Sequence, residues 1–229
     1  MTALIGYCFD GGAFLVADTT RIVNHPNTSN YWAHVQTDKI GLATCGTPID
    51  EARLALHSQI RSTDGVQKIV NTAINSYRPF LLKNNIADTN LLIFGHEKGT
   101  GFISHLDWNS VSSNFNIFNY SSGSIVADGI LPSDTIKSAD SLLKKSKTLA
   151  GGYQLDFWAQ SIMNTLVNHT ASRSNSFGVN PIGFPIDLMI FREIDKKNYQ
   201  SYKRIPVPNP NLSTMIQSKV SKDIFTIYM

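Results

Sequence analysis

The first residues after the initiator methionine read Thr2-Ala-Leu-Ile-Gly-Tyr-Cys-Phe-Asp-Gly-Gly-Ala-Phe-Leu-Val-Ala-Asp18. Residues 3–9 and 13–17 are apolar, and many of them are β-branched or aromatic, which favours strands. The intervening Asp10-Gly11-Gly12 is a hairpin turn signal. The stretch therefore predicts two antiparallel strands, with Thr2 in front of the first and a carboxylate closing the second.

Thr2 would carry both a hydroxyl and a free α-amine if Met1 is removed, as is generally expected before so small a residue. The amine can take the hydroxyl proton while the oxygen attacks a carbonyl, so one residue can act as nucleophile and base. Many chains begin Met-Thr without such a role. The hypothesis therefore depends on the rest of the chain.

Four more segments follow in order. They are Asp38-Lys39-Ile40, Cys45-Gly46-Thr47-Pro48-Ile49-Asp50, Ser121-Ser122-Gly123-Ser124-Ile125-Val126-Ala127-Asp128-Gly129 and Gly183-Phe184-Pro185-Ile186-Asp187-Leu188. Together with the N-terminal stretch, they resemble proteasome β-type subunits and their bacterial relatives of the HslV, Anbu and BPH kinds. The resemblance is good over the first quarter of the chain and patchy after that. It needs a longer loop before Lys39 and has Ser121 in place of a glycine.

The order of strand and helix patterns along the chain predicts an α+β fold. The resemblance implies more, namely the four-layer αββα N-terminal nucleophile (Ntn) hydrolase sandwich, with two antiparallel sheets between helix layers. It also implies a peptidase without a cofactor, assembled as a homo-oligomeric ring that encloses its sites. An ATPase unfoldase that feeds substrates to the ring would fit the same resemblance.

The resemblance gives roles to three residues near Thr2. Asp18 would orient Lys39, whose ammonium would favour loss of the Thr2 hydroxyl proton. The alternative for this pair is an ordinary salt bridge. Gly46, before a predicted helix, would direct its backbone N–H at a developing oxyanion. Gly46 could equally serve only to permit a tight strand-to-helix turn.

By the same resemblance, three small residues would line the substrate side-chain pocket: Thr44, Pro48 and Ala52. Ser122 would hydrogen-bond near the Thr2 amine, or it is simply a turn serine. Asn180 would replace an acidic residue that the family carries just before the glycine matched by Gly183. This departure from the family pattern weakens the case for full activity.

Periodicity predicts further elements. Thr47 is the expected N-cap, and Pro48 the first residue, of a helix that runs to about Arg61. The other expected helices cover residues 66–83, with Pro79 as a kink, 124–131, 138–149, 156–169 and 212–228. The expected strands are 90–96, 101–107, 115–120, 187–193 and 200–205.

Composition limits the class of protein. The 229 residues, 42% hydrophobic and 16% charged, fit one domain spanning residues 1–229, with an extension from about residue 206. The net charge of +3 is weak and scattered, so we expect no nucleic-acid partner. Two cysteines, Cys8 and Cys45, predict no disulfide framework and favour a reduced, cytoplasmic protein. We expect no membrane span, and the six histidines show no metal-ligand spacing.

The sequence thus predicts a self-compartmentalising threonine peptidase. Two alternatives stay open: a weakly active or inactive ring scaffold, and an amidase of the same fold that acts on small amides. A free Thr2 amine that reacts with an electrophilic peptide separates the enzymes from the scaffold. Digestion of a peptide library separates the peptidase from the amidase.

Overall fold

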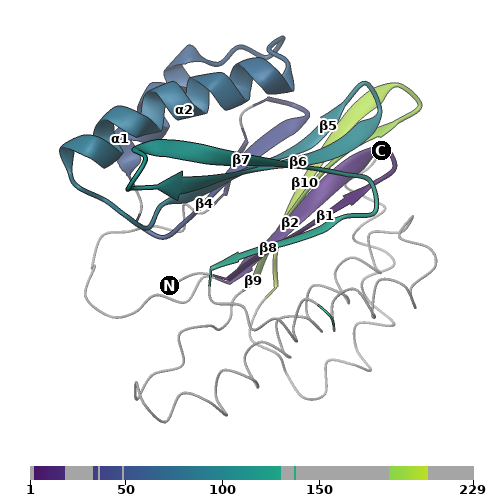
Figure 1. Ribbon diagram of the computed structural model, residues 1–229. Helices are drawn as coiled ribbons and strands as arrows, with labels where there is room; N and C mark the ends of the chain where they lie inside the picture. The colour runs from purple at the N-terminus through teal and green to yellow at the C-terminus, as the bar shows by residue number, and fades with distance from the viewer. Residues whose placement is uncertain are drawn as a thin grey trace.

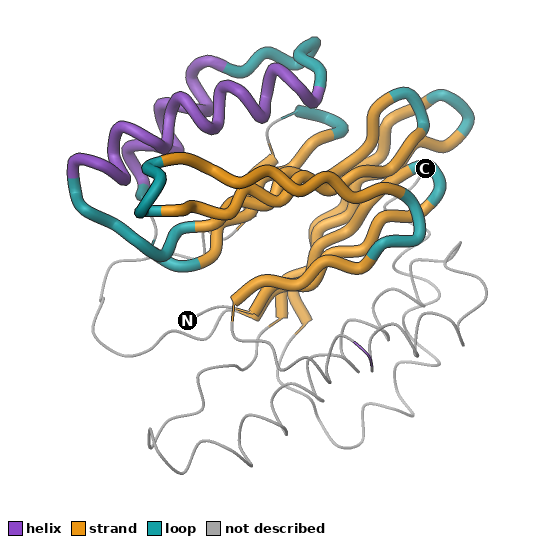
Figure 2. The backbone as a smooth tube through the Cα atoms, in the orientation of Figure 1, coloured by secondary structure: helices purple, strands orange, loops and turns teal. Residues whose placement is uncertain are grey.

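The structure, a computed structural model, describes residues 3–18, 33–35, 37–47, 49–129, 137 and 186–205. These residues form a mixed α/β fold with two five-stranded antiparallel sheets and two long helices. The two sheets lie one above the other, and both helices cover the outer face of one sheet (Figures 1 and 2). The described layers are therefore helix, sheet and sheet. The fourth layer of the expected sandwich stays a prediction.

The first sheet has the strand order β10-β9-β2-β1-β8. Its strands are β1 (Ala3–Phe9), β2 (Gly12–Asp18), β8 (Ile125–Gly129), β9 (Ile186–Ile194) and β10 (Lys197–Ile205). β1 and β2 form the predicted hairpin, and Phe9 pairs with Gly12 beside its turn. The late hairpin expected from residues 187–205 is also confirmed.

The second sheet has the strand order β3-β4-β5-β6-β7. Its strands are β3 (Ala33–Val35), β4 (Ile40–Cys45), β5 (Asn90–Glu97), β6 (Thr100–Asn109) and β7 (Asn114–Ser121). The three strands predicted in the middle of the chain are confirmed as β5, β6 and β7. Consecutive strands are neighbours here. Short turns favour this for β5–β6 and β6–β7, whereas α1 and α2 lie between β4 and β5 in the chain.

The two helices, α1 (Asp50–Gln59) and α2 (Val66–Lys83), also match their predictions. The predicted N-cap does not, because Ile49 occupies the cap position without a side-chain hydrogen bond. The Thr47 hydroxyl instead donates to Asp88 Oδ1 at 2.7 Å. Thr47 is thus a residue type that often caps helices, but here its hydroxyl binds Asp88, which is distant in the sequence.

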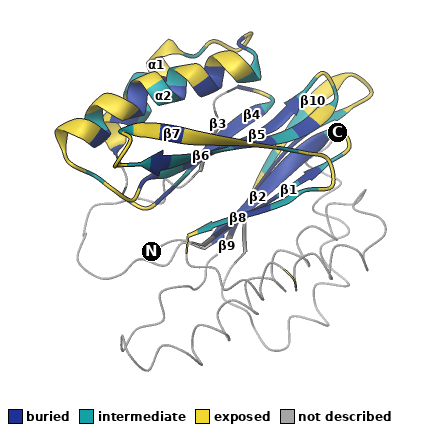
Figure 3. Ribbon diagram, viewed as in Figure 1, coloured by how far each residue is buried: buried dark blue, intermediate teal, exposed yellow. Residues whose placement is uncertain are grey.

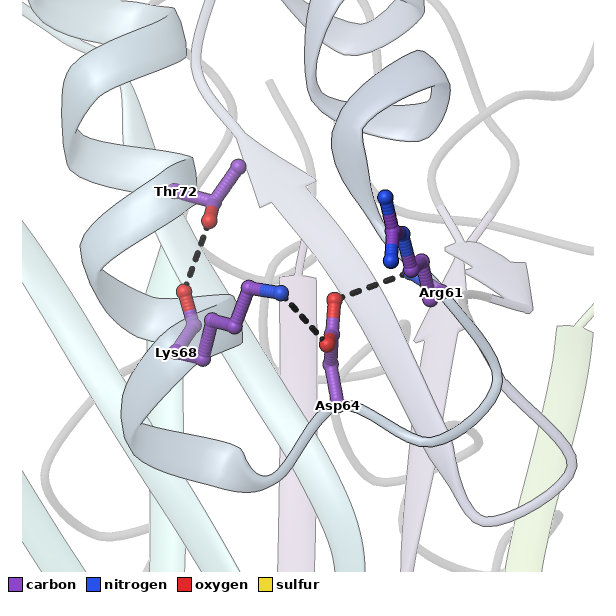
Figure 4. Close-up of polar contacts among 4 residues, drawn as sticks. All are labelled: Arg61, Asp64, Lys68 and Thr72. Atoms are coloured by element: carbon purple, nitrogen blue, oxygen red, sulfur yellow. Dashed lines mark hydrogen bonds and ion pairs between the residues drawn. The ribbon is translucent and has the colours of Figure 1, made fainter.

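The turn between the two helices is fixed by Asp64, whose polar contacts Figure 4 shows. Its side chain is almost fully buried. Lys68 Nζ donates to Asp64 Oδ1 at 2.7 Å, and the Arg61 backbone N–H donates to Oδ2 at 2.9 Å. These bonds, led by that of Lys68, hold the pKa of Asp64 below its ordinary value. The carboxylate thus joins the end of α1 to the first turn of α2.

Two apolar layers hold the elements together. One lies between the helices and the second sheet and includes Leu56, Tyr77 and Leu91. The other lies between the sheets, where Phe94 of β5 meets Phe191 of β9 edge to face, with ring centroids 5.5 Å apart. Such an aromatic pair contributes about 0.5–1.5 kcal/mol beyond its buried area. In Figure 3 the central strands β2 and β5 are largely buried, whereas the edge strand β7 and the outer helix surface are largely exposed.

One predicted helix is wrong. Residues 124–131 were expected to be helical, but Ile125–Gly129 form β8, which pairs with β1 along residues 3–7. A run this short, with Ile125 and Val126 at its start, has no periodicity that separates strand from helix. Pairing with the otherwise open edge of β1 makes this segment a strand. The other expected helices (138–149, 156–169 and 212–228) and the extension from residue 206 lie outside the described residues.

Candidate functional site

The paired sheets have two ends, which we call the Ala3 end and the Asp10 end. The Ala3 end contains the start of β1 and the end of β4, after Cys45. Asn90 of β5 connects these two places. It pairs with Cys45 within the second sheet, and its side-chain amide donates to Asp128 Oδ1 of the first sheet at 3.2 Å. Asp128 in turn pairs with Leu4 on β1. The beginning of β1 and the β4–α1 turn therefore share one end of the molecule.

The Asp10 end contains the β1–β2 turn. Asp10 forms an isolated bridge with Thr100, at the β5–β6 turn of the second sheet. The Asn198 side-chain amide donates to Asp38 Oδ2 at 2.6 Å, which adds the β3–β4 turn to the same end. A strand rises about 3.3 Å per residue, so the two ends lie roughly 20 Å apart.

Gly46 lies at the Ala3 end, directly after β4, in a conformation that favours glycine (φ +91°). A Cβ on Gly46 would overlap the backbone carbonyl of Asp88. The Thr89 hydroxyl fastens the same turn by donating to the Thr47 carbonyl at 2.8 Å. These two contacts restrict the backbone of Gly46 and Thr47, and an oxyanion-binding backbone N–H needs a fixed position of this kind.

We expect Gly46→Ala to destabilise the protein much more than Gly123→Ala. Gly123 has a similar φ of +88° but no heavy atom within 4 Å of an added Cβ. The left-handed backbone alone costs about 1–2 kcal/mol for alanine, and the clash at Gly46 adds about 1–3 kcal/mol. Urea unfolding of both variants measures the difference. Equal losses would show that the Asp88 carbonyl does not fix this turn.

A polar cluster occupies the space between the sheets at the Ala3 end. Asp128 Oδ1 accepts from the Asn90 amide and from the Gly129 backbone N–H, the latter at 2.7 Å. His105 Nε2 of β6 lies 3.2 Å from Asp128 Oδ2, and both side chains are nearly buried (14% and 11% exposed). Asn90 Oδ1 also accepts from the Trp108 backbone N–H at 3.1 Å. The cluster therefore connects the edge strand β8 to two strands of the opposite sheet.

The electrostatics of this cluster favour an ionised Asp128. Burial raises the pKa of the Asp128 carboxyl, but His105, the Gly129 N–H and the Asn90 amide together hold it below its ordinary value. Hydrogen bonds to the charged form of a carboxyl act in this direction. The Ala3 end thus presents a fixed, partly desolvated carboxylate.

Lys39 does not belong to this end. It precedes β4 in the β3–β4 turn, and its carbonyl accepts from the His96 backbone N–H at 3.1 Å. Seven residue steps along β4 separate Lys39 from Gly46, or about 23 Å at the rise of a strand. The prediction that Lys39 joins Gly46 and the start of β1 in one site is therefore wrong. The Lys39 charge acts instead on the buried His96, whose pKa is lowered mainly by burial.

Ser122 also lies at the Asp10 end. Its hydroxyl donates to Asp10 Oδ1 at 2.6 Å, and the neighbouring Gly123 N–H donates to the Cys8 carbonyl at 2.9 Å. The structure therefore does not bring Ser122 to the beginning of β1. It has the alternative role considered from the sequence, that of a turn serine.

The remaining predicted residues are only partly described. Thr44 is half-buried on β4, and Ala52 is buried in α1. The backbone of Asp18 ends β2 at the Ala3 end, because the preceding Ala17 pairs with Leu4. The Asp18 side chain and the residues Thr2, Pro48 and Asn180 lie outside what the structure describes.

Sequence reasoning missed the three residues of the polar cluster. Asn90 begins one largely apolar strand pattern, and His105 interrupts another. A polar residue in such a pattern is the signal that could have indicated both. Asp128 was assigned to the helix expected at residues 124–131. It could not be placed beside β1 until that segment was known to be a strand.

Three further features of the described residues concern a reactive thiol, a metal site and a membrane-spanning helix. Cys8 and Cys45 are buried, and burial raises the pKa of the Cys8 thiol to about 12, which makes this thiol unreactive. In the described ranges, no group of three or more His, Cys, Asp or Glu side chains could hold a metal ion. Neither described helix is long and apolar enough to cross a membrane.

Comparison with solved structures finds the same fold in Anbu from Hyphomicrobium sp. strain MC1, one of the bacterial proteasome-like proteins that the motifs resemble. A structure of its (Gly-1) mutant has a TM-score of 0.60 and 15% identity, and the match covers 99% of this chain and 97% of that chain. A second Anbu structure has a TM-score of 0.58, 15% identity, and coverages of 98% and 97%. At this identity the likeness shows the fold alone. No protein-family model and no curated protein matches the chain.

Proposed function

We propose that the protein is a proteasome-type N-terminal hydrolase that cuts peptide bonds with Thr2 after Met1 is removed. The observation that carries the proposal is the common location of β1's first residue and the Gly46 turn at the Ala3 end. Chain connectivity keeps Thr2 within one peptide unit, about 3.8 Å, of Ala3. The nucleophile, its own amine and a rigid backbone donor would then meet at one end of the sheets.

The proposed reaction is acyl transfer in two steps. The Thr2 hydroxyl attacks the substrate carbonyl while the Thr2 amine takes its proton, and the peptide's amine leaves with that proton. Water then hydrolyses the threonine ester, with the amine again acting as base. The Gly46 N–H would stabilise the oxyanion in both steps. This chemistry requires no cofactor.

Lys39 and Ser122 are not part of this proposal, because both lie at the Asp10 end. Asp18 remains in it, since its backbone position is at the Ala3 end. We retain Asn180 as the proposed substitute for the family's acidic residue and Thr44, Pro48 and Ala52 as pocket residues. A homo-oligomeric ring, fed by an ATPase unfoldase, is the assembly that would keep such a site away from folded proteins.

An electrophilic peptide, such as a peptide epoxyketone, tests the proposal directly. We expect one adduct per chain, located by mass spectrometry on the peptide that begins with Thr2, in protein whose intact mass shows Met1 removed. A free Thr2 without an adduct would favour the inactive ring scaffold. Labelling without cleavage of any peptide in a library would favour the amidase of small amides.

A further inference from the structure

We propose that Asp128 is the acceptor that binds the Thr2 α-amine and stabilises the ammonium formed when this amine takes the hydroxyl proton. The inference rests on the proposed function, and it gives a role to a residue that one of the quoted motifs contains but to which the resemblance assigned none. Asp128 would be a positioning residue, since it acts through the amine and not on the substrate. Its role resembles that of a carboxylate that holds and stabilises a catalytic imidazolium.

Strand register supplies the proximity. Ala3 pairs with Gly129 and Leu4 pairs with Asp128, so the side chains of Leu4 and Asp128 share a face of the first sheet. Thr2 is joined to Ala3 by one peptide unit, so their Cα atoms are about 3.8 Å apart. Asp128 is likewise the residue directly before Gly129, the partner of Ala3. The Asp128 carboxylate and the Thr2 amine therefore each start one residue from the same cross-strand pair.

The face in question is the one between the sheets. Leu4 is fully buried there in the same cluster as Leu92 of the opposite sheet. Asn90 lies two residues before Leu92 and therefore points to the same side. This explains why Asp128 meets Asn90 and His105, which belong to the other sheet. The carboxylate is thus directed inward at the Ala3 end and not toward the outer surface.

The partners of Asp128 leave one of its oxygens well suited to a further cation. Oδ1 is occupied by Asn90 and the Gly129 N–H. Oδ2 has only the His105 contact, at 3.2 Å, and neither of these atoms has a hydrogen bond of good geometry among the described residues. The His105 contact replaces only part of the hydration that this carboxylate oxygen loses on burial, and the remaining loss is costly. An ammonium donor from Thr2 would make up for this loss.

The proton balance is simple. The hydroxyl proton of Thr2 moves to the Thr2 nitrogen, which becomes an ammonium beside a carboxylate that keeps its charge. The proton then passes to the leaving amine of the substrate, and Asp128 is unchanged. A negative neighbour raises the pKa of the Thr2 amine. Removing the Asp128 charge must therefore lower the pKa of the Thr2 amine and move the acid limb of the pH–activity profile to lower pH.

Other titratable groups face the same space and must stay constant in the comparison. They are His105 and Asp107 of β6, Cys45 of β4 and Asp187 of β9. Asp107 pairs with Asn90 and shares its face, so it places a second carboxyl group near this end. Asp187 lies three strands away from β8, or about 14 Å. Neither is altered by a substitution at position 128.

The test compares Asp128→Asn with wild type, and Asp195→Asn serves as the matched control. Asp195 is exposed in the β9–β10 turn, in a left-handed conformation (φ 51°) that asparagine tolerates. The pH profile of kcat/KM is measured with a fluorogenic peptide. We expect Asp128→Asn to move the acid limb down by about one pH unit and to lower kcat about tenfold. The control should match wild type, and an unmoved limb in an active Asp128→Asn enzyme would overturn the inference.

A second measurement does not depend on activity. The amine pKa is obtained from the pH dependence of acylation of residue 2, followed by intact mass, in the Thr2→Ala protein with and without Asp128→Asn. We expect a fall of about one unit from an α-amine reference near 8. If this fall occurs but wild type cleaves no peptide, the proposed function fails and the contact stands. If wild type cleaves peptides but the pKa is unchanged, the inference fails alone. Asp128→Ser, with the same expected fall, replaces Asp128→Asn if the latter does not fold.

Discussion

Thr2→Ala is expected to reduce peptide hydrolysis by about a thousandfold or more, as the removal of a catalytic nucleophile does in other hydrolases. The alanine variant keeps the α-amine but has no oxygen to form the acyl-enzyme. β1 begins at Ala3, and its pairing with β2 and β8 uses residues 3–9, so folding should be unaffected. The measurement is the initial rate of peptide cleavage by protein with confirmed N-termini.

Thr2→Ser is the matched control, because it removes a methyl group and keeps both the hydroxyl and the amine. It should retain a large part of the activity, and circular dichroism should show unchanged unfolding for both variants. Activity in Thr2→Ala that persists after rigorous purification would falsify the mechanism, since no described residue could replace an oxygen on residue 2 without moving β1.

The fold was predictable where a signal lay within a few residues. The β1–β2 hairpin follows from Asp10-Gly11-Gly12 between two apolar runs, and α2 follows from Ile69, Ala73 and Tyr77 at helical spacing. β8 was not predictable in this way. Its five residues take their conformation from the open edge of β1, a partner more than one hundred residues away in the chain.

The candidate site shows the same contrast. Gly46 was placed correctly after β4 because the turn and the start of a helix are both visible in the local sequence. Lys39 was misplaced because a short motif does not reveal at which end of a strand its residues lie. Here Asp38 and Lys39 form the β3–β4 turn itself, at the Asp10 end. Only the register between the strands distinguishes the two arrangements.

Asp128 shows what pairing across the sheets adds. Its neighbours Asn90 and His105 are separated from it by 38 and 23 positions in the sequence, and no local pattern connects the three. They meet because the edge strand β8 lies over β5 and β6 at the Ala3 end. Sequence patterns can therefore indicate which residue types are unusual in a strand, but the three-dimensional fold decides which of them meet.

A short extension before Thr2 is expected to abolish hydrolysis while leaving the protein folded. An amide nitrogen has no usable lone pair, so acylation of Thr2 removes the proposed base as completely as Thr2→Ala removes the nucleophile. The extension would also occupy space at the Ala3 end, where the substrate carbonyl must approach Gly46. Retained Met1 should have the same effect for the same two reasons.

A single preparation with a cleavable tag tests this expectation, because the same molecules are assayed before and after the protease exposes Thr2. The rate should rise by about a thousandfold or more on cleavage, in step with the fraction of free Thr2 found by intact mass. A tag at the C-terminus, cleaved by the same protease, controls for the protease and for tag removal as such. A hydrolase whose base is a side chain would be indifferent to the state of this amine. Equal activity before and after cleavage would therefore place the catalytic base elsewhere, and both Thr2 and its proposed partner Asp128 would lose their roles.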